Sequence, residues 1–102
     1  MKTNVIEEAA LNNARHIVLE KLRGTTARVY LFGSRAQGKH RAASDIDIGI
    51  LDDAPLADGL LSDIRESLFE STIPYRVDVV DLGQVDAQFR QRVLNEGIPW
   101  KD

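Results

Sequence analysis

The segment Asp45–Ile50 alternates strictly between isoleucine and other residues, and this pattern constrains the structure more than any other part of the chain. Successive side chains of a β-strand point to opposite faces, so Ile46, Ile48 and Ile50 would share one face and Asp45 and Asp47 the other. The segment therefore predicts a strand that buries isoleucines on one side and holds two carboxylates side by side on the other.

A helix is predicted before this strand, from about Val5 to Arg23. Asn4, with Glu7 three residues later, has the form of a capping box, although Asn replaces the usual Ser or Thr. Gly24 suits the position that follows a helix C-terminus. One stripe of this helix is apolar: Leu11, Ala14, Val18 and Leu22.

Two further elements flank the alternating strand. The apolar run Val29–Phe32 predicts a strand buried on both faces, which stops at Gly33 and Ser34. The polar segment Arg35–Ser44 predicts a loop that opens with a helical turn.

Asp52–Pro55 predicts the start of a second helix, because acidic residues and proline favour a helix N-terminus. The apolar positions of that helix have a spacing of four: Leu56, Leu60, Ile64 and Leu68.

Pro74 closes the second helix, and the β-branched segment Arg76–Asp81 predicts a third strand. We interpret Ile98–Trp100, which follows a last helix ending at Gly97, as an apolar tail. Strands that alternate with amphipathic helices predict an α/β or α+β layered fold, and 102 residues suit a single domain, 1–102. The apolar positions of the last helix are Val85, Phe89 and Val93.

Composition and charge argue against several classes of protein. The chain has no cysteine, which excludes disulfides and thiolate metal sites. It also has no run of about 18 apolar residues that could span a membrane. Its start is acidic and lacks the apolar stretch of a secretory signal, so a cytoplasmic protein is expected. A formal net charge of −3 argues against a nucleic-acid partner, because such proteins usually carry a basic face.

The carboxylates of Asp45 and Asp47 would repel each other if left partly buried without a counter-charge. Mg²⁺ removes that penalty, since it prefers hard oxygen ligands and keeps positions open for substrate phosphates. Two carboxylates can also bridge a pair of metal ions for displacement at phosphorus. A third carboxylate would complete such a site. Asp78 lies between two valines and faces away from them, so we favour it over Asp81, which we expect to cap the next turn.

Gly33 and Ser34 lie where a strand gives way to a tight loop. Glycine permits a positive φ and close backbone approach. Backbone N–H groups at such a turn can hold the phosphates of a nucleotide, with the serine hydroxyl as a further donor. The chain lacks G-x-x-x-x-G-K-[ST] and G-x-G-x-x-G, which argues against a P-loop and against a Rossmann dinucleotide site.

Residues 33–50, GSRAQGKHRAASDIDIGI, resemble the G-S-x₁₀-D-x-D signature of the DNA polymerase beta nucleotidyltransferase superfamily, and the short chain resembles its minimal nucleotidyltransferase branch. The resemblance extends over nearly the whole length and implies a small mixed β-sheet with flanking helices. It implies that Gly33 and Ser34 hold the triphosphate, with Arg35 as a further phosphate contact. The residues that it implies as Mg²⁺ ligands and catalytic groups are Asp45, Asp47 and Asp78, the last nearest the acceptor.

The resemblance also implies a reaction and a partner. A nucleoside monophosphate, in the first place AMP from ATP, would move onto an acceptor hydroxyl. Minimal nucleotidyltransferases are often paired with a small helical HEPN protein in toxin–antitoxin modules. The resemblance therefore implies an antitoxin that adenylylates a HEPN toxin, on a group such as a tyrosine hydroxyl.

Two other functions stay open. The chain could neutralise a partner by binding alone, or it could modify a small molecule such as an aminoglycoside. Three poised carboxylates argue against the first, and the lack of an acceptor domain argues against the second. The choice of base and of Mg²⁺ or Mn²⁺ also stays open, because both metals accept oxygen ligands.

Five other residues have no settled role. Lys39 and Arg41 either steer a triphosphate or form a solvated loop. Trp100 is either part of the core or an interface anchor. His16 and His40 have no partner at metal-ligand spacing, so we expect both at the surface.

Overall fold

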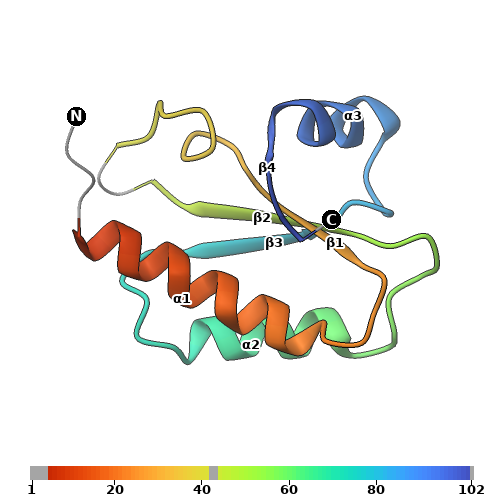
Figure 1. The fold of residues 1–102 in the computed structure, drawn as a ribbon. Helices are drawn as coiled ribbons and strands as arrows, with labels where there is room; N and C mark the ends of the chain where they lie inside the picture. Colours follow the sequence, from red (N-terminus) through yellow and green to blue (C-terminus); the bar gives the residue numbers. More distant parts are fainter. Residues whose placement is uncertain (1–4, 42–43, 102) are drawn as a thin grey trace.

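The computed structural model describes residues 5–41 and 44–101 (Figure 1). Its strands form one sheet in the order β3-β2-β1-β4, in which β1 is antiparallel to both neighbours and β2 is parallel to β3. The predicted mixed sheet with flanking helices is therefore confirmed. The elements are α1 (Val5–Lys21), β1 (Arg28–Phe32), β2 (Ile46–Leu51), α2 (Leu60–Phe69), β3 (Val77–Asp81), α3 (Ala87–Glu96) and β4 (Ile98–Lys101).

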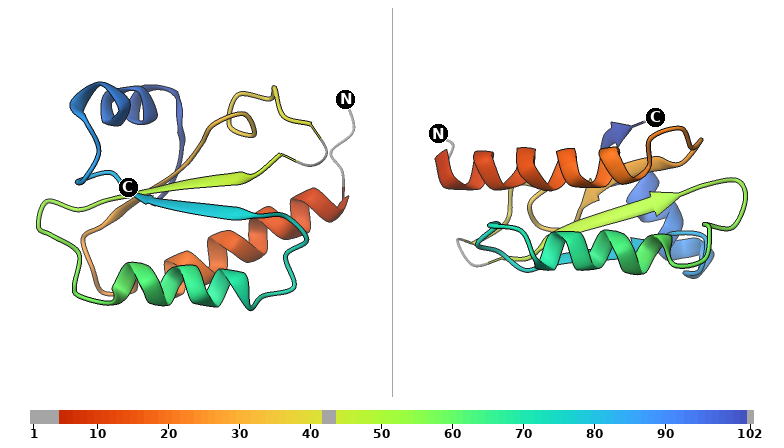
Figure 2. Two further views of the ribbon diagram at one scale, coloured as in Figure 1. Left: turned by 180° about the vertical axis from the view of Figure 1, so that it is seen from behind. Right: turned by 90° about the horizontal axis from the view of Figure 1, so that it is seen from below.

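The helices divide between the two faces of the sheet. Helices α1 and α2 lie side by side across one face, and α3 lies apart from them near β4 (Figures 1 and 2). Under α1 and α2, the side chains of Ile46, Ile48 and Ile50 are each 0% exposed. Full burial of such a side chain contributes roughly 1.5–3 kcal/mol. The predicted isoleucine face is confirmed, and it forms the centre of the main core.

The opposite face is only partly covered. Tyr30, Leu82 and Val93 are buried in a second, smaller apolar cluster beneath α3. A Cβ atom at Gly49 would lie 2.8 Å from the Leu82 side chain, so this cluster presses directly on the sheet. Asp47 lies on the same face nearer the start of β2, where it is half-buried. One end of this face is therefore packed and the other is left to polar side chains.

The second helix begins later than the sequence predicts. We expected it to start at Asp52–Pro55, but α2 begins at Leu60, after Gly59 in a left-handed conformation. The Asp52 carboxylate instead accepts hydrogen bonds from the Thr26 hydroxyl (2.6 Å) and from the Asp53 backbone N–H (2.8 Å). Because these contacts satisfy it, Asp52 stabilises a loop and caps no helix. Leu56 packs against the core from this loop.

The apolar tail is a fourth strand. Ile98 and Pro99 of β4 pair with Leu31 and Tyr30 of β1, contrary to our interpretation of 98–100 as a tail. Proline cannot donate to a ladder, but β4 is an edge strand, where proline is tolerated. Trp100 packs against the main core, which favours the core role over an interface role.

The ends of α1 agree in part with expectation. The helix ends at Lys21, two residues before the predicted end, and Gly24 has the expected positive φ of 82°. Asn4, the first residue of the expected capping box, lies outside the described residues. Across residues 5–41 and 44–101, no helix has both the length and the hydrophobicity needed to cross a bilayer.

Candidate active site

Two predicted acids meet on adjacent strands. Asp47 of β2 is in direct register with Asp78 of β3 in the parallel pair. Residues in register on neighbouring strands point to the same face, so both carboxylates lie on the face opposite α1 and α2. Asp78 is exposed, whereas Asp47 is half-buried. The structure thus brings together two of the three predicted acids across a strand boundary.

Gly33 lies against the Asp47 carboxylate. Phe32, the last residue of β1, pairs with Asp47, and the chain then turns at Gly33 with a φ of 78°. A Cβ atom at Gly33 would lie 2.3 Å from Asp47 Oδ2. Only glycine fits this position, because any side chain would collide with the carboxylate and would strain the backbone. The predicted phosphate turn and the predicted metal ligand are therefore immediate neighbours.

The loop after Gly33 opens with a helical turn, as predicted. Gln37 N–H donates to the Gly33 carbonyl (3.3 Å), and Lys39 N–H donates to the Ser34 carbonyl (2.9 Å). A turn of this kind directs the N–H groups at its start away from its own carbonyls, which is the arrangement that binds anions. Ser34 is half-buried at this start.

Negative charge accumulates around Asp47. Burial raises the pKa of the Asp47 carboxyl above its usual value, and the nearby carboxylates of Asp78 and Asp45 raise that pKa further. The guanidinium groups of Arg35 and Arg76 partly offset this effect. Asp45 itself lies one residue before β2 rather than in the strand. Its charge nevertheless reaches Asp47, so all three predicted acids belong to one electrostatic cluster.

The donor set around Asp47 fits a hard divalent cation, because its ligands would be carboxylate oxygens whose mutual repulsion a cation relieves. Within residues 5–41 and 44–101, no three His, Cys, Asp or Glu side chains already stand in an arrangement that would enclose a metal ion. The assignment of Asp45, Asp47 and Asp78 as metal ligands stays a prediction.

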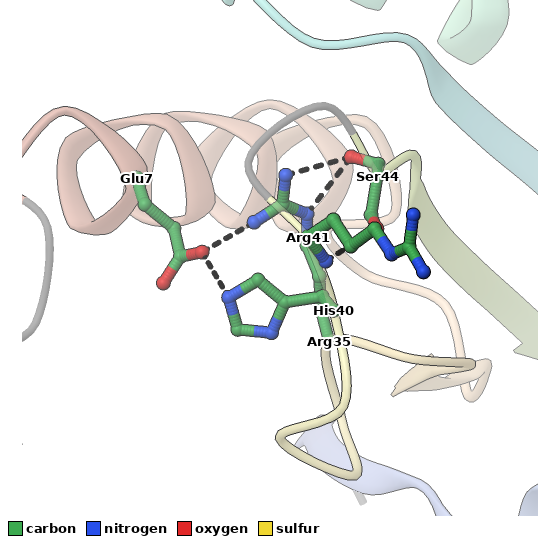
Figure 3. A network of polar contacts seen from close by, with 5 residues as sticks. All are labelled: Glu7, Arg35, His40, Arg41 and Ser44. Carbon is green, nitrogen blue, oxygen red and sulfur yellow. Dashed lines mark hydrogen bonds and ion pairs between the residues drawn. The ribbon is translucent and has the colours of Figure 1, made fainter.

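Arg35 makes a network that ties both ends of the loop to α1 (Figure 3). Its guanidinium donates to the Ser44 carbonyl through Nε (3.1 Å) and Nη2 (2.6 Å), and Nη1 pairs with the Glu7 carboxylate. The Arg35 side chain also lies over the Tyr75 ring, 4.3 Å from its centroid. Arg35 is only 6% exposed. The phosphate contact of Arg35 stays a prediction, and these contacts give Arg35 a positioning role between Ser34 and Asp45.

The histidines differ from each other. His16 is exposed, as predicted, but His40 is half-buried, and its Nε2 pairs with the same Glu7 oxygen that binds Arg35. We expected His40 at the surface because no metal ligand lies at the right spacing, and sequence spacing gave no sign of the distant Glu7. Lys39 and Arg41 are exposed, which leaves their two roles open.

Asp81 caps a turn, as expected. Its carboxylate accepts a hydrogen bond from the Gly83 backbone N–H at 2.9 Å, just after β3 ends. The next helix, α3, has its own cap, because Asp86 accepts from the Phe89 N–H at 2.9 Å. The choice of Asp78 over Asp81 as the acid that accompanies Asp47 therefore agrees with the geometry.

Sequence reasoning missed Arg76 as a member of the site. Arg76 directly precedes β3 and is exposed, and its charge lowers the pKa of Asp47. It lies two residues before Asp78, and this period-two spacing in the sequence could have identified it. A basic group beside the acids adds a positive charge that suits the phosphates of a substrate.

Known proteins resemble this chain in sequence and in fold. Residues 18–100 match the family described as "Polymerase beta, Nucleotidyltransferase". The probable protein adenylyltransferase MntA of Haemophilus influenzae is 41% identical over 64 residues, which are 62% of this chain. The matched segment spans 55% of the length of that protein.

Solved structures agree with this match. A structure described as a "putative minimal nucleotidyltransferase" superposes with a TM-score of 0.71 at 28% identity, over 97% of this chain and 99% of that chain. A toxin–antitoxin complex with AMP-PNP superposes with a TM-score of 0.68 at 28% identity, over 86% of this chain and 70% of that chain. The family match covers most of the sequence and includes Gly33, Asp47 and Asp78, so the chain belongs to the polymerase beta nucleotidyltransferase family.

Proposed function

We propose that this chain is a Mg²⁺-dependent nucleotidyltransferase that moves AMP from ATP onto a hydroxyl of a HEPN-family toxin and thereby acts as its antitoxin in the cytoplasm. One observation carries the proposal. The phosphate turn at Gly33 touches Asp47, and Asp47 lies in register with Asp78. A phosphate-binding turn beside paired carboxylates suits displacement at phosphorus.

Each residue has a place in this reaction. The turn at Gly33 and Ser34 would bind the β- and γ-phosphates and orient the donor. Asp45, Asp47 and Asp78 would hold Mg²⁺, with Asp78 nearest the acceptor. When bound, the metal supplies positive charge that offsets the charge of the phosphates. Asp78 lies across β2 from Gly33, so the acceptor approaches from the β3 side, opposite the departing pyrophosphate.

The transfer is an in-line displacement at the α-phosphorus. The acceptor oxygen forms a bond to the α-phosphorus, and the bond from that phosphorus to the bridging oxygen of the β-phosphate breaks. Pyrophosphate leaves with that oxygen. The Asp78 carboxylate accepts the hydroxyl proton, which its exposed position allows.

The partner assignment is supported by two similar proteins. The Haemophilus influenzae relative is called a probable protein adenylyltransferase, and one similar structure is a toxin–antitoxin complex. A protein acceptor also suits a single domain, 1–102, because the partner would supply the surface that a larger enzyme builds for itself.

The test combines the purified chain with α-labelled ATP, Mg²⁺ and lysate of its own host. We expect label on one protein band, and no label with the Asp45→Ala/Asp47→Ala variant. The Asp53→Ala/Asp58→Ala variant is the matched control, because it removes the same charge from exposed residues of the loop before α2. Mass spectrometry of the band identifies the acceptor and the modified residue.

Three outcomes would contradict the proposal. Label that persists in the Asp45→Ala/Asp47→Ala variant would show that another enzyme performs the transfer. Label on an added aminoglycoside but on no protein would favour the small-molecule reaction. No label, with the toxin present and neutralised equally by both double variants, would favour an antitoxin that acts by binding alone.

A further inference from the structure

We propose that two copies of this chain pair edge to edge through β3 and so join their sheets into one. The strand order β3-β2-β1-β4 leaves one edge of β3 without a neighbouring strand in the described part of the chain. An open edge presents unpaired N–H and C=O groups, which are a template for pairing with another strand. The charges along β3 fit a second copy of the same strand.

The pairing of β3 with β2 shows which backbone groups face the open edge. Ile46 N–H donates to the Arg76 carbonyl at 2.9 Å, so residues of even number in and beside β3 bond to β2. The N–H and C=O groups of Val77 and Val79 therefore point away from β2. The Val79 carbonyl accordingly accepts a hydrogen bond from Arg65 Nη2 (2.7 Å). Among the described residues, none bonds to the N–H or the C=O of Val77.

Val77 can thus exchange two hydrogen bonds with one residue of an antiparallel strand. A two-fold axis at Val77 places this residue opposite itself, and each copy donates its N–H to the carbonyl of the other. The residues on either side then pair in reverse order, so Arg76 of one copy lies opposite Asp78 of the other. Side chains directly opposite each other are close enough to form an ion pair, and the axis generates this contact twice.

The charges of β3 select this register over its neighbours. An axis at residue 78 would place Asp78 opposite Asp78, and an axis at residue 76 would place Arg76 opposite Arg76. Like charges directly opposite each other are destabilising. Arg76 is exposed, and within residues 5–41 and 44–101 no ion pair joins it to an acid. Its guanidinium is therefore available to the Asp78 carboxylate of a second copy.

A groove beside the open edge has room for apolar side chains of the second copy. The groove has a volume of about 720 Å³ and lies between α2 and β3, with Phe69, Ile73 and Val77 among its walls. Val77 is in register with Ile46, on the face that α2 covers, and paired residues share a face. Val77 of the second copy therefore points toward the groove. The Phe69 ring is 90% exposed, so pairing would also cover apolar surface that a single chain leaves in water.

Pairing through β3 adds a residue of the second copy to the candidate site. Asp78 lies in register with Asp47, on the face where negative charge accumulates. Arg76 of the second copy would lie beside Asp78 on this face. Each copy thus supplies a positive charge to the acids of the other.

The test measures the oligomeric state of the full chain by sedimentation equilibrium, without nucleotide or divalent cation, at concentrations up to about 1 mM. The parent should pass from monomer to dimer as its concentration rises. Arg76→Asp places acids opposite acids, and Asp78→Arg places bases opposite bases. Each variant alone should therefore dimerise at least about 10-fold more weakly than the parent. An equal mixture of the two variants restores both ion pairs and should dimerise like the parent.

Matched controls make the same changes of charge elsewhere. Arg92→Asp on α3 and Asp53→Arg in the loop before α2 alter exposed residues away from β3, and neither should change dimerisation. Phe69→Ala should weaken the dimer several-fold, because it removes the exposed ring beside the groove. Ile98→Ala, at an exposed apolar residue of the other edge strand, should leave the dimer unchanged.

Edge pairing is overturned if the parent stays monomeric over the whole range, a result that would leave the open edge to a strand of a different protein. It is also overturned if the equal mixture dimerises no better than either variant alone. A dimer that neither Arg76→Asp nor Asp78→Arg weakens would form through another surface, which would likewise contradict pairing through β3. None of these outcomes depends on nucleotidyl transfer, so the proposed function is tested separately.

Discussion

The two faces of this sheet obey opposite rules, although they share the same strands. Under α1 and α2, Ile46, Ile48 and Ile50 are fully buried and contribute only apolar packing. On the other face of β2, Asp47 is held beside Asp78 and near Asp45, and burial, followed by repulsion from these two acids, raises the pKa of the Asp47 carboxyl. The difference teaches that packing on the apolar face stabilises the fold. The protein can therefore tolerate, on the other face, an acidic cluster that is unfavourable by itself.

The largest expected effect is on the rate of transfer, after a substitution on the acidic face. Under the proposed function, Asp47→Asn should lower the rate of transfer by roughly 1,000-fold, because a carboxylate that holds a metal ion contributes several kcal/mol to the transition state. Measured rates with labelled ATP check this. Asp53→Asn, on an exposed loop residue, should leave the rate unchanged.

Asp47→Asn should also be more stable than the parent protein at neutral pH. Burial, Asp78 and Asp45 raise the folded-state pKa of Asp47 above its unfolded value, so the folded state binds more protons. The stability of the parent therefore falls as pH rises through the range above the unfolded pKa, and asparagine removes that loss. Urea unfolding at about pH 3 and at pH 7 should show the advantage of asparagine only at the higher pH. A less stable variant at pH 7 would contradict this account.

The next effect belongs to the apolar face. Ile48→Ala removes a fully buried side chain and should cost about 3 kcal/mol of unfolding free energy. Because Ile48 points away from Asp47, the affinity of the folded protein for ATP should hold. Denaturant unfolding and calorimetry together measure both quantities, and a parallel loss of affinity would show that the two faces are not independent.

A smaller effect concerns two glycines with similar backbone. Gly33 and Gly24 have φ values of 78° and 82°, so the backbone strain of alanine should cost about 1 kcal/mol in stability at either position, and the collision with Asp47 should add to that cost at position 33. Only alanine at Gly33 meets Asp47, whereas nothing lies within 4 Å at Gly24. Transfer should therefore fall in Gly33→Ala and hold in Gly24→Ala. Equal activity in the two variants would show that the contact with Asp47 has no role.

The smallest effect is expected in the network in which Glu7 pairs with Arg35, a residue of the loop that follows Gly33. Glu7→Gln keeps an acceptor for Arg35 but removes the charge, and it should cost about 1 kcal/mol of stability. Affinity for tripolyphosphate should fall slightly, since Arg35 holds the backbone between Ser34 and Asp45. Glu8→Gln, at the exposed neighbouring residue, is the control for both measurements.

Local rules predicted the features that depend on a single strand. The period of two along Ile46–Ile50 correctly divided isoleucines from acids, and the valines around Asp78 correctly gave its face. The features that were missed depend on distant partners. Asp52 stabilises a loop because its carboxylate accepts a hydrogen bond from the Thr26 hydroxyl. Residues 98–101 form a strand because they pair with the edge of β1. The partners of Arg35 are likewise distant in sequence, so its burial could not be inferred from the motif.

The ion pair between Glu7 and Arg35 also sets how this protein can be shortened or grafted. The family match begins at Val18. The buried Arg35 guanidinium, however, pairs with the carboxylate of Glu7 in the first turn of α1. A fragment that starts at residue 18 would keep every motif residue and lose that counter-charge. The segment that matches the family is therefore shorter than the segment that keeps this buried ion pair intact.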